Sequence, residues 1–242
     1  MYPVSQPANY DRAATMFSPD GRLYQVEYAS KIVSQGTMGV ACKYNHGVIF
    51  GAFKKINSKL LLPDSVEKIF PIDDHIVAVS AGLVGDARRI IGNARQKAQE
   101  NRMYYEESIQ IETLVKEVSN VKQVFTQYGG MRPFGVSLII GGVDNTGKRL
   151  FETEPSGALA EYHAIAVGKN RNKAMELFEK DWKENLSKEA AVKLLLKALE
   201  HGLDEKEKFD VNKLQFTIVD EAREFKQVTQ EELKGYMNNS KQ

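Results

Sequence analysis

The sequence predicts an α+β protein in which two antiparallel sheets pack face to face between outer helices, a four-layer αββα sandwich. Three observations predict this fold. Strand pairs joined by short turns alternate twice with pairs of long helices, the strands carry the apolar patterns of sheet cores, and each helix has an apolar stripe to bury. No proline- or glycine-rich linker divides residues 1–242, so we expect a single domain.

The composition is that of a globular protein, with 42% hydrophobic and 27% charged residues. A formal charge of +1 gives no attraction to nucleic acid or to an anionic membrane, so we expect neither as a partner. The chain has no apolar run of membrane-spanning length and no signal-peptide pattern at its start, which favours a cytoplasmic protein. The single cysteine, Cys42, alternates with Val40 and Tyr44 in strand-like sequence, which indicates a buried thiol.

The first part of the chain is unusually rich in aromatic residues. Residues 1–9 contain two prolines and no apolar period, so we expect residues 1–11 to be flexible. The sequence at 18–21, Ser-Pro-Asp-Gly, predicts a turn, and Ser18 or Asp20 could cap a helix over 20–34. That helix has two apolar stripes, one of Leu23, Val26, Ala29 and Val33 and one of Tyr24, Tyr28 and Ile32. Because packing on one core needs one stripe, we expect this helix to lie between two bodies.

Two hairpins and two helices follow. The strands are expected at 38–44, 48–53, 67–72 and 75–81, with turns at 45–47 and 73–74. Apolar residues at helical spacing then predict helices over 83–98 and 111–125.

The same order then repeats. Strands are expected at 135–143, 149–154 and 160–168, helices around 175–182 and 194–199, and a last strand pair at 213–221 and 224–229. Ser187 can cap the fourth of these long helices. Thr229 and Glu232 have the spacing of a capping box for a short final helix.

Two glycine-containing segments resemble nucleotide-binding motifs and fit them poorly. The stretch "GGVDNTGKR" has Gly142, Gly147 and Lys148 at P-loop spacing, but Arg149 and a strand follow where the motif needs Ser or Thr and a helix. A hairpin turn at 144–147 explains it better. In "SAGLVGDAR" the first glycine of a dinucleotide fingerprint is replaced by Ser80, which favours a tight strand–helix junction.

The titratable residues indicate no metal or cofactor. His46, His75, His163 and His201 are scattered, and turn or surface positions suit each of them. The acidic pairs at 73–74, 106–107 and 231–232 lie in turns or at helix starts, where we expect them to be solvated.

One catalytic possibility remains from the residues alone. Thr37 follows Gly36 and precedes the first strand, the position at which N-terminal-nucleophile hydrolases expose a threonine after self-cleavage. Such cleavage would discard the whole aromatic leader.

Several motifs resemble the α subunits of archaeal-type 20S proteasomes. They are Tyr10-Asp11-Arg12, "FSPDGRLYQVEYA" at 17–29, "VEKIFPIDD" at 66–74, "SAGLVGDAR" at 80–88 and "QYGGMRPFGVSLIIGG" at 127–142. The resemblance runs from Tyr10 to the last helix, and the leader motif is specific for α over β subunits. It implies the N-terminal-nucleophile hydrolase fold with an added leader helix.

The resemblance also implies a function and partners. It predicts a heptameric ring of identical or homologous α subunits that stacks on β subunits, which carry the peptidase sites. In this family the retained leader helix lies against the neighbouring subunit, and the segment before it gates an axial channel for unfolded proteins. By resemblance, Tyr10, Asp11, Pro19 and Tyr28 form the cluster that holds the gate open. The loop of Gly129, Gly130, Met131, Arg132 and Pro133 narrows the channel entrance.

A second implied site binds activators. With Gly36 and Leu83, Lys68 is expected to line a pocket between subunits that receives the C-terminal tails of activating ATPases.

The catalytic relatives have an acid after the first hairpin, where this chain has Phe53-Lys54-Lys55. The sequence therefore favours a non-catalytic structural and gating subunit, without cofactor, of a threonine-type endopeptidase complex. A self-processing threonine hydrolase with Thr37 as nucleophile remains the alternative. "SKIVSQGTMG" at 30–39 and Gly85 depart from the family pattern, which affects the expected shape of the pocket.

Overall fold

The computed structural model describes residues 10, 12–54, 56, 58–204, 209–222 and 224–238. Residues 1–9 and Asp11 lie outside this range. The prediction that residues 1–11 form a flexible gate segment is therefore untested, apart from the position of Tyr10.

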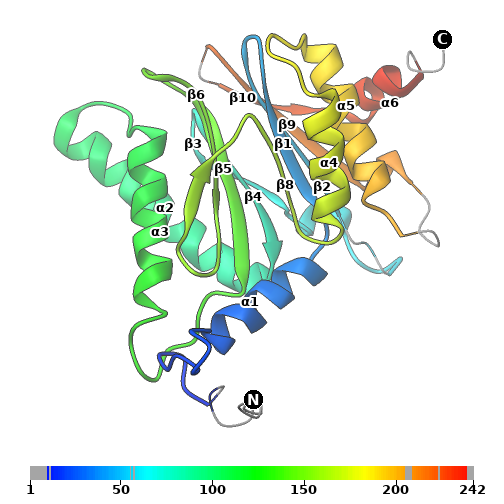
Figure 1. The fold of residues 1–242 in the computed structure, drawn as a ribbon. Coiled ribbons are helices and arrows are strands. Elements are labelled where there is room, and N and C mark those ends of the chain that lie inside the picture. Colours follow the sequence, from blue (N-terminus) through cyan, green and yellow to red (C-terminus); the bar gives the residue numbers. More distant parts are fainter. Residues whose placement is uncertain are drawn as a thin grey trace.

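Two five-stranded antiparallel sheets form the centre of the molecule (Figure 1). The first has the order β10-β9-β2-β1-β8 and the second the order β3-β4-β5-β6-β7. The strands of the first sheet are β1 (Gly39–Tyr44), β2 (Gly47–Phe53), β8 (Ala164–Val167), β9 (Leu214–Asp220) and β10 (Phe225–Val228). Those of the second are β3 (Ile69–Asp73), β4 (Ile76–Gly82), β5 (Val136–Asp144), β6 (Gly147–Thr153) and β7 (Leu159–Glu161).

Helices cover the two outer faces (Figure 1). α2 (Val84–Tyr105) and α3 (Ile111–Val124) lie on the second sheet, and α4 (Arg171–Asp181) and α5 (Lys188–His201) lie on the first. α6 (Gln230–Asn238) packs beside α5, and two short 3₁₀ helices, η2 (Pro63–Ser65) and η3 (Val211–Lys213), lie in connections. α1 (Tyr24–Gln35) lies across one end of the sandwich against β4 and β5. The predicted four-layer αββα sandwich is confirmed. None of the described helices has the length and apolar character needed to cross a membrane.

Three buried clusters correspond to the three interfaces between layers. One lies between the sheets and includes Ala41, Phe50, Val79 and Ile139. The others lie under the two helix pairs. Cys42 points the opposite way from Ala41, into the cluster under α4 and α5, because side chains alternate along a strand. Its thiol is fully buried, and burial raises its pKa to about 12, which confirms the prediction of an inert core cysteine.

One predicted strand is two strands in different sheets. The sequence suggested a single strand over 160–168, whereas β7 pairs with β6 of the second sheet and β8 pairs with β1 of the first. The backbone crosses between the sheets at Tyr162 and His163, whose N–H and C=O bond to Leu150 and Lys43 respectively. Residues on both sides of the crossing are paired as strands, so the sequence looks like one continuous strand and does not show where the chain changes sheets.

The expected cap of the leader helix is wrong. α1 begins at Tyr24, after Leu23 at the cap position, with no side-chain cap. Ser18 instead closes the turn before it, since its Oγ accepts from the Arg22 N–H at 3.1 Å and its C=O accepts from the Gly21 N–H at 2.8 Å. Gly21 has φ of +75°, which a glycine adopts without strain. The turn at 18–21 is therefore confirmed, and the helix begins at Tyr24, four residues after its expected start at residue 20.

The other local predictions are largely confirmed. Ser187 accepts from the Ala190 N–H at the start of α5, and Thr229 and Glu232 exchange the two bonds of a capping box. Residues 144–147 form the β5–β6 turn, and the Lys148 ammonium donates to the carbonyls of Tyr44 and Asn45, which accounts for this segment without a phosphate. Phe125 and Trp182, expected on helices, lie one residue beyond α3 and α4.

The prediction of solvated turn residues is wrong at the β3–β4 turn. His75 is buried, with Nε2 2.9 Å from the carbonyl oxygen of Ile109. Asp73 is buried beside it and accepts from the Arg102 guanidinium at 3.0 Å. Asp73 contacts the end of α2 and His75 contacts the α2–α3 connection. The β3–β4 turn, although polar in sequence, is therefore covered by the end of α2 and the connection that follows it.

Candidate functional site

The leader segment and the predicted channel-entrance loop lie side by side. Residues 12–15 and Gln25 share a cavity of about 390 Å³ with Gly129, Gly130, Met131 and Arg132. Figure 1 shows the leader, in dark blue, next to the loop that follows α3. The two segments are more than 100 residues apart in sequence, and the resemblance assigned both to the axial channel. The structure thus places the leader beside four residues of the predicted loop, while none of the predicted gate residues that the structure describes lines this cavity.

The loop is fixed by a carboxylate that sequence reasoning missed. Asp86, in the first turn of α2, accepts from both terminal nitrogens of Arg132 at 2.7 and 2.8 Å, and from the Gly135 N–H at 2.8 Å. The bond from Arg132 is the main reason that the pKa of Asp86 is lowered. Asp86 is part of the "SAGLVGDAR" motif, and an acid in a first helical turn is the signal that could have identified it.

The gate cluster is described in part. Tyr10 is half-buried, Pro19 is exposed in the turn at 18–21, and Tyr28 is 42% exposed on α1, where its ring stacks on Tyr24 with centroids 6.4 Å apart. Asp11 lies outside the described residues. The proposal that these four residues act as one cluster therefore stays a prediction.

Lys68 and Gly36 line a common cavity of about 350 Å³. Lys68 is 4% exposed, and its ammonium has no hydrogen bond or ion pair with any residue in the described part of the chain. Burial lowers its pKa to about 8. Leu83 does not line this cavity, although its neighbours Gly82 and Val84 do. It packs toward Gly135 and is 39% exposed. Two of the three residues predicted for the pocket are therefore brought together.

The same cavity contains the alternative nucleophile. Thr37 is half-buried and continuous in sequence with Gly36 and the leader helix. Neither a carboxylate nor a histidine is among the residues that line the cavity. The position after β2, where the catalytic relatives have an acid, is Lys54, whose ammonium donates to the carbonyl of Pro63 at 3.2 Å. The titratable side chains that line the cavity with Thr37 are Lys68 and Lys169, so the acid of the catalytic relatives has no counterpart among the described residues around it.

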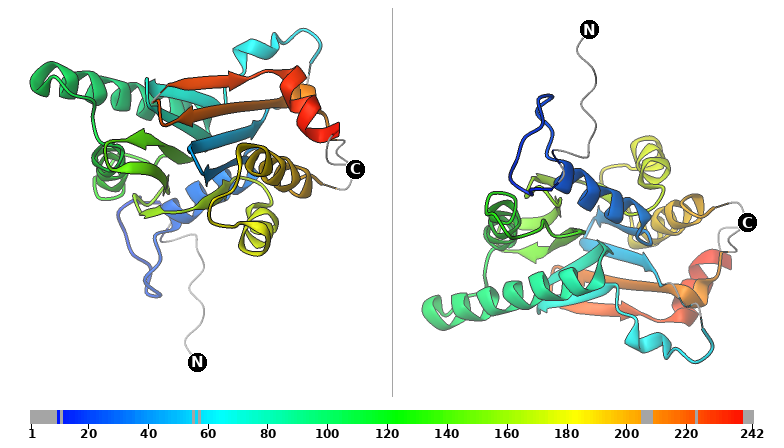
Figure 2. Two further views of the ribbon diagram at one scale, coloured as in Figure 1. Left: turned by 90° about the horizontal axis from the view of Figure 1, so that it is seen from above. Right: turned by 90° about the horizontal axis from the view of Figure 1, so that it is seen from below.

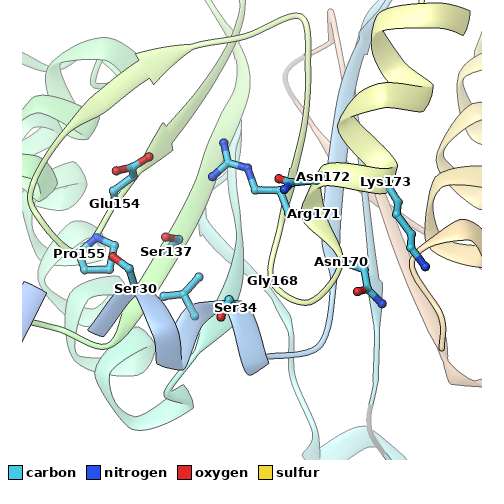
Figure 3. A pocket seen from close by; sticks show the side chains of 11 residues that line it. Ser30, Ser34, Ser137, Glu154, Pro155, Gly168, Asn170, Arg171, Asn172 and Lys173 are labelled. Carbon is cyan, nitrogen blue, oxygen red and sulfur yellow. The ribbon is translucent and has the colours of Figure 1, made fainter. Parts of the chain in front are cut away.

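A further cavity, of about 560 Å³, lies between α1, the start of β5 and the start of α4 (Figure 3). Ser30 and Ser34 line it from α1, with Ser137 and Glu154 from the second sheet. Arg171 lines its other side and donates to both carboxylate oxygens of the buried Glu152 at 2.8 and 2.7 Å. None of the sequence-predicted site residues lines this cavity.

Comparison with known proteins identifies the class that this fold and leader define. Residues 33–219 match the family model for proteasome subunits, and residues 10–31 match the N-terminal signature of A-type proteasome subunits. The chain is 47% identical over 230 residues to the proteasome alpha subunit of Methanosarcina mazei, covering 95% of this chain and 92% of that protein. It is 53% identical over 194 residues to that of Methanothermobacter thermautotrophicus, covering 80% and 78%, and 48% identical over 231 residues to that of Archaeoglobus fulgidus, covering 96% and 93%.

The chain therefore belongs to the proteasome subunit family and is of the archaeal α type. The α-type signature supports the role of a structural ring subunit over that of a self-processing hydrolase. As a member of this family the chain assembles with other proteasome subunits.

Proposed function

We propose that this chain is a non-catalytic structural and gating subunit of the outer, heptameric α ring of a 20S proteasome. The observation that carries the proposal is the cavity that residues 12–15 share with the loop at 129–132. A segment that lies against the rim of a channel is well placed to position the residues before it across the opening. Asp86 and Arg132 hold the rim side of this cavity, so that a change in the leader is not absorbed by movement of the loop.

The cavity around Lys68 and Gly36 supports the second part of the proposal, docking of the C-terminal tails of regulatory ATPases. A buried ammonium without an acceptor among the described residues is suited to receive a carboxylate, since each of its N–H groups needs a partner. The tail terminus supplies that carboxylate, and the apolar walls of Met38, Phe53 and Leu199 accommodate side chains preceding it.

The partners of the chain follow from this role. They are the neighbouring α subunits, the β subunits that hold the peptidase sites, the ATPase tails, and unfolded proteins in transit. No cofactor is needed, because the chain itself performs no chemistry. We place the assembly in the cytoplasm.

Deletion of residues 1–11 tests the gating role. In particles assembled with the β partner, the truncated chain should degrade casein without an ATPase, because the plug that limits admission of unfolded protein is removed. Hydrolysis of a short fluorogenic peptide is the control, and it should rise far less because small substrates pass more easily. Equal casein degradation by full-length and truncated particles would contradict the proposal.

Thr37→Ala separates the structural subunit from the threonine hydrolase. The variant should assemble and leave the peptidase activity of the particle unchanged, because Lys54 stands where the catalytic relatives have their acid. The intact mass of the wild-type chain should include the leader. Loss of activity in Thr37→Ala, together with a mature chain that begins at Thr37, would establish the hydrolase instead.

A further inference from the structure

The first turn of α4 presents backbone donors without partners. Asn170 precedes the helix in the left-handed conformation, with φ of +55°, and its side-chain amide donates to residues after α5. The Asn172 N–H has no acceptor among the described residues, and the Arg171 N–H has only a long bond of 3.4 Å to the carbonyl of Gly168. Helix ends of this kind bind anions readily, because the free N–H groups point at the ligand.

The charges at the start of α4 also favour an anion. Acidic side chains are stabilising in the first turn of a helix, where the dipole is positive, yet α4 has none there and carries Arg171 and Lys173 instead. Glu152 offsets the charge of Arg171 through its two hydrogen bonds. Lys173 forms no salt bridge with any residue in the described part of the chain, so this end of the helix keeps an excess of positive charge.

The cavity of about 560 Å³ in front of this turn supplies an independent observation. Ser137 lines it and is 3% exposed, and its hydroxyl has no hydrogen-bond partner among the described residues. Buried polar groups almost always have a partner, so this hydroxyl indicates a polar occupant of the cavity.

The far side of the cavity differs in chemistry from the α4 side. Figure 3 shows the Arg171 side chain pointing into the cavity from α4, with Ser30, Ser137 and Glu154 across from it. Seen from below, α1 crosses the end of the sandwich with α4 beside it, and the cavity lies between these two helices (Figure 2). One side therefore offers donors and positive charge, and the other offers hydroxyls and one carboxylate.

We propose that this cavity binds a small phosphomonoester, with its phosphoryl group at the first turn of α4 and its hydroxyl groups at Ser137 and Glu154. The phosphoryl oxygens accept from the N–H groups of Arg171 and Asn172, and Lys173 attracts their charge. Glu154 accepts from ligand hydroxyls and repels a second anionic group, which disfavours di- and triphosphates. The volume lies in the range of small-molecule sites. This binding activity goes beyond the gating role and does not rest on it.

Calorimetry with the full-length chain tests the class of ligand. Glucose 6-phosphate is the probe, and inorganic phosphate, glucose and ATP are compared at equal ionic strength. Glucose 6-phosphate should bind about tenfold more tightly than inorganic phosphate, because its hydroxyls add bonds on the far side of the cavity. Glucose should not bind, and ATP should bind more weakly than glucose 6-phosphate. Equal affinity for the two phosphates would replace the phosphomonoester by free phosphate and overturn the proposal in this form. Binding of neither phosphate, or tighter binding of ATP, would overturn it entirely.

A matched pair of variants at Ser30 locates the site. Ser30 is exposed on α1 and lines the cavity, so its replacement does not disturb the core. Ser30→Asp brings a carboxylate into the cavity and should weaken binding of glucose 6-phosphate by about tenfold through repulsion. Ser30→Asn has the same shape without the charge and should bind as the wild type does. Equal affinities of these two variants would show that the ligand binds elsewhere.

Ser137→Ala tests the contact on the far side. Loss of the unpaired hydroxyl should weaken binding of glucose 6-phosphate by about two- to tenfold, the value of one neutral hydrogen bond, and leave inorganic phosphate unaffected. Native mass spectrometry of each variant checks that its assembly is that of the wild type. An unchanged affinity for glucose 6-phosphate in Ser137→Ala would overturn the assignment of the hydroxyl groups to this side.

Discussion

Lys68 is a buried lysine just before β3, where its carbonyl accepts from the N–H of Ser80. What suits Lys68 to bind a carboxylate is its buried position, since lysines on the surface are common and bind carboxylates weakly. Burial without a described acceptor lowers the pKa of its ammonium to about 8, so the group changes charge just above neutral pH. A carboxylate that entered the cavity would restore the ordinary, higher pKa.

Tail docking should therefore weaken as the pH rises above about 8. Below that value the empty cavity holds an ammonium that attracts the carboxylate, and above it binding must first take up a proton. The affinity of a tail peptide, measured by calorimetry from pH 6.5 to 9.5, should fall above pH 8 for the wild-type ring. Lys68→Ala should lower affinity by about tenfold to a hundredfold at pH 7, the value of one charged hydrogen bond of roughly 1.5–3 kcal/mol.

Lys68→Arg is the matched control, because a guanidinium stays charged across this range. Its affinity, whatever its absolute value, should not fall above pH 8. A wild-type affinity that is constant with pH would show that Lys68 does not receive the carboxylate.

At the scale of elements, the loop at 129–133 is held in place by hydrogen bonds to the first turn of α2. Asp86 satisfies both the exposed Arg132 and the backbone N–H of Gly135, next to the start of β5. These two bonds are not equivalent, because a guanidinium at the surface can turn to water and a half-buried backbone N–H cannot.

Asp86→Ala should therefore destabilise the protein more than Arg132→Ala. The first change leaves the Gly135 N–H unpaired, at about 1–3 kcal/mol. The second removes the exposed partner of the ion pair, since the Arg132 side chain is 62% exposed, at about 0–1 kcal/mol. Urea unfolding at fixed protein concentration measures both. Equal losses would show that the ion pair, and not the backbone bond, fixes the loop.

Much of the element order could be predicted from the sequence, and the exceptions share a cause. Periodicity predicted the helix pairs and most strands, and the Ser187 and Thr229 caps were visible because their partners lie within three residues. The β7–β8 crossing, the burial of His75 and the role of Asp86 depend on residues that are distant in sequence. For the site, the resemblance supplied Lys68, Gly36 and the loop, while the unpartnered ammonium and the cavity shared by leader and loop required the structure.

At the scale of the whole molecule, one buried lysine ties an outer helix to the second sheet. Lys122 of α3 is fully buried, and its ammonium donates to the carbonyl of Val136 in β5 at 3.1 Å and to the carbonyl and hydroxyl of Thr153 in β6 at 2.9 and 2.8 Å. Burial lowers its pKa to about 7, although Glu152 and Glu154 act in the opposite direction. The link between layers is therefore sensitive to pH.

The free energy of unfolding should consequently rise with pH above about 7, and less so in Lys122→Met. Between the folded pKa of about 7 and the unfolded value of roughly 10.4, the unfolded chain binds a proton that the folded chain has released, so higher pH favours folding. The contribution is at most about 1.4 kcal/mol per pH unit.

The readout is the difference in slope between wild type and variant in urea unfolding at pH 6.5, 8 and 9.5, at one protein concentration. Lys68 is present in both chains, so its own titration cancels, and the carbonyls that Lys122→Met leaves unpaired shift stability equally at every pH. Parallel slopes would mean that the Lys122 ammonium keeps its proton across this range, and that the three acceptors around it outweigh the cost of burial.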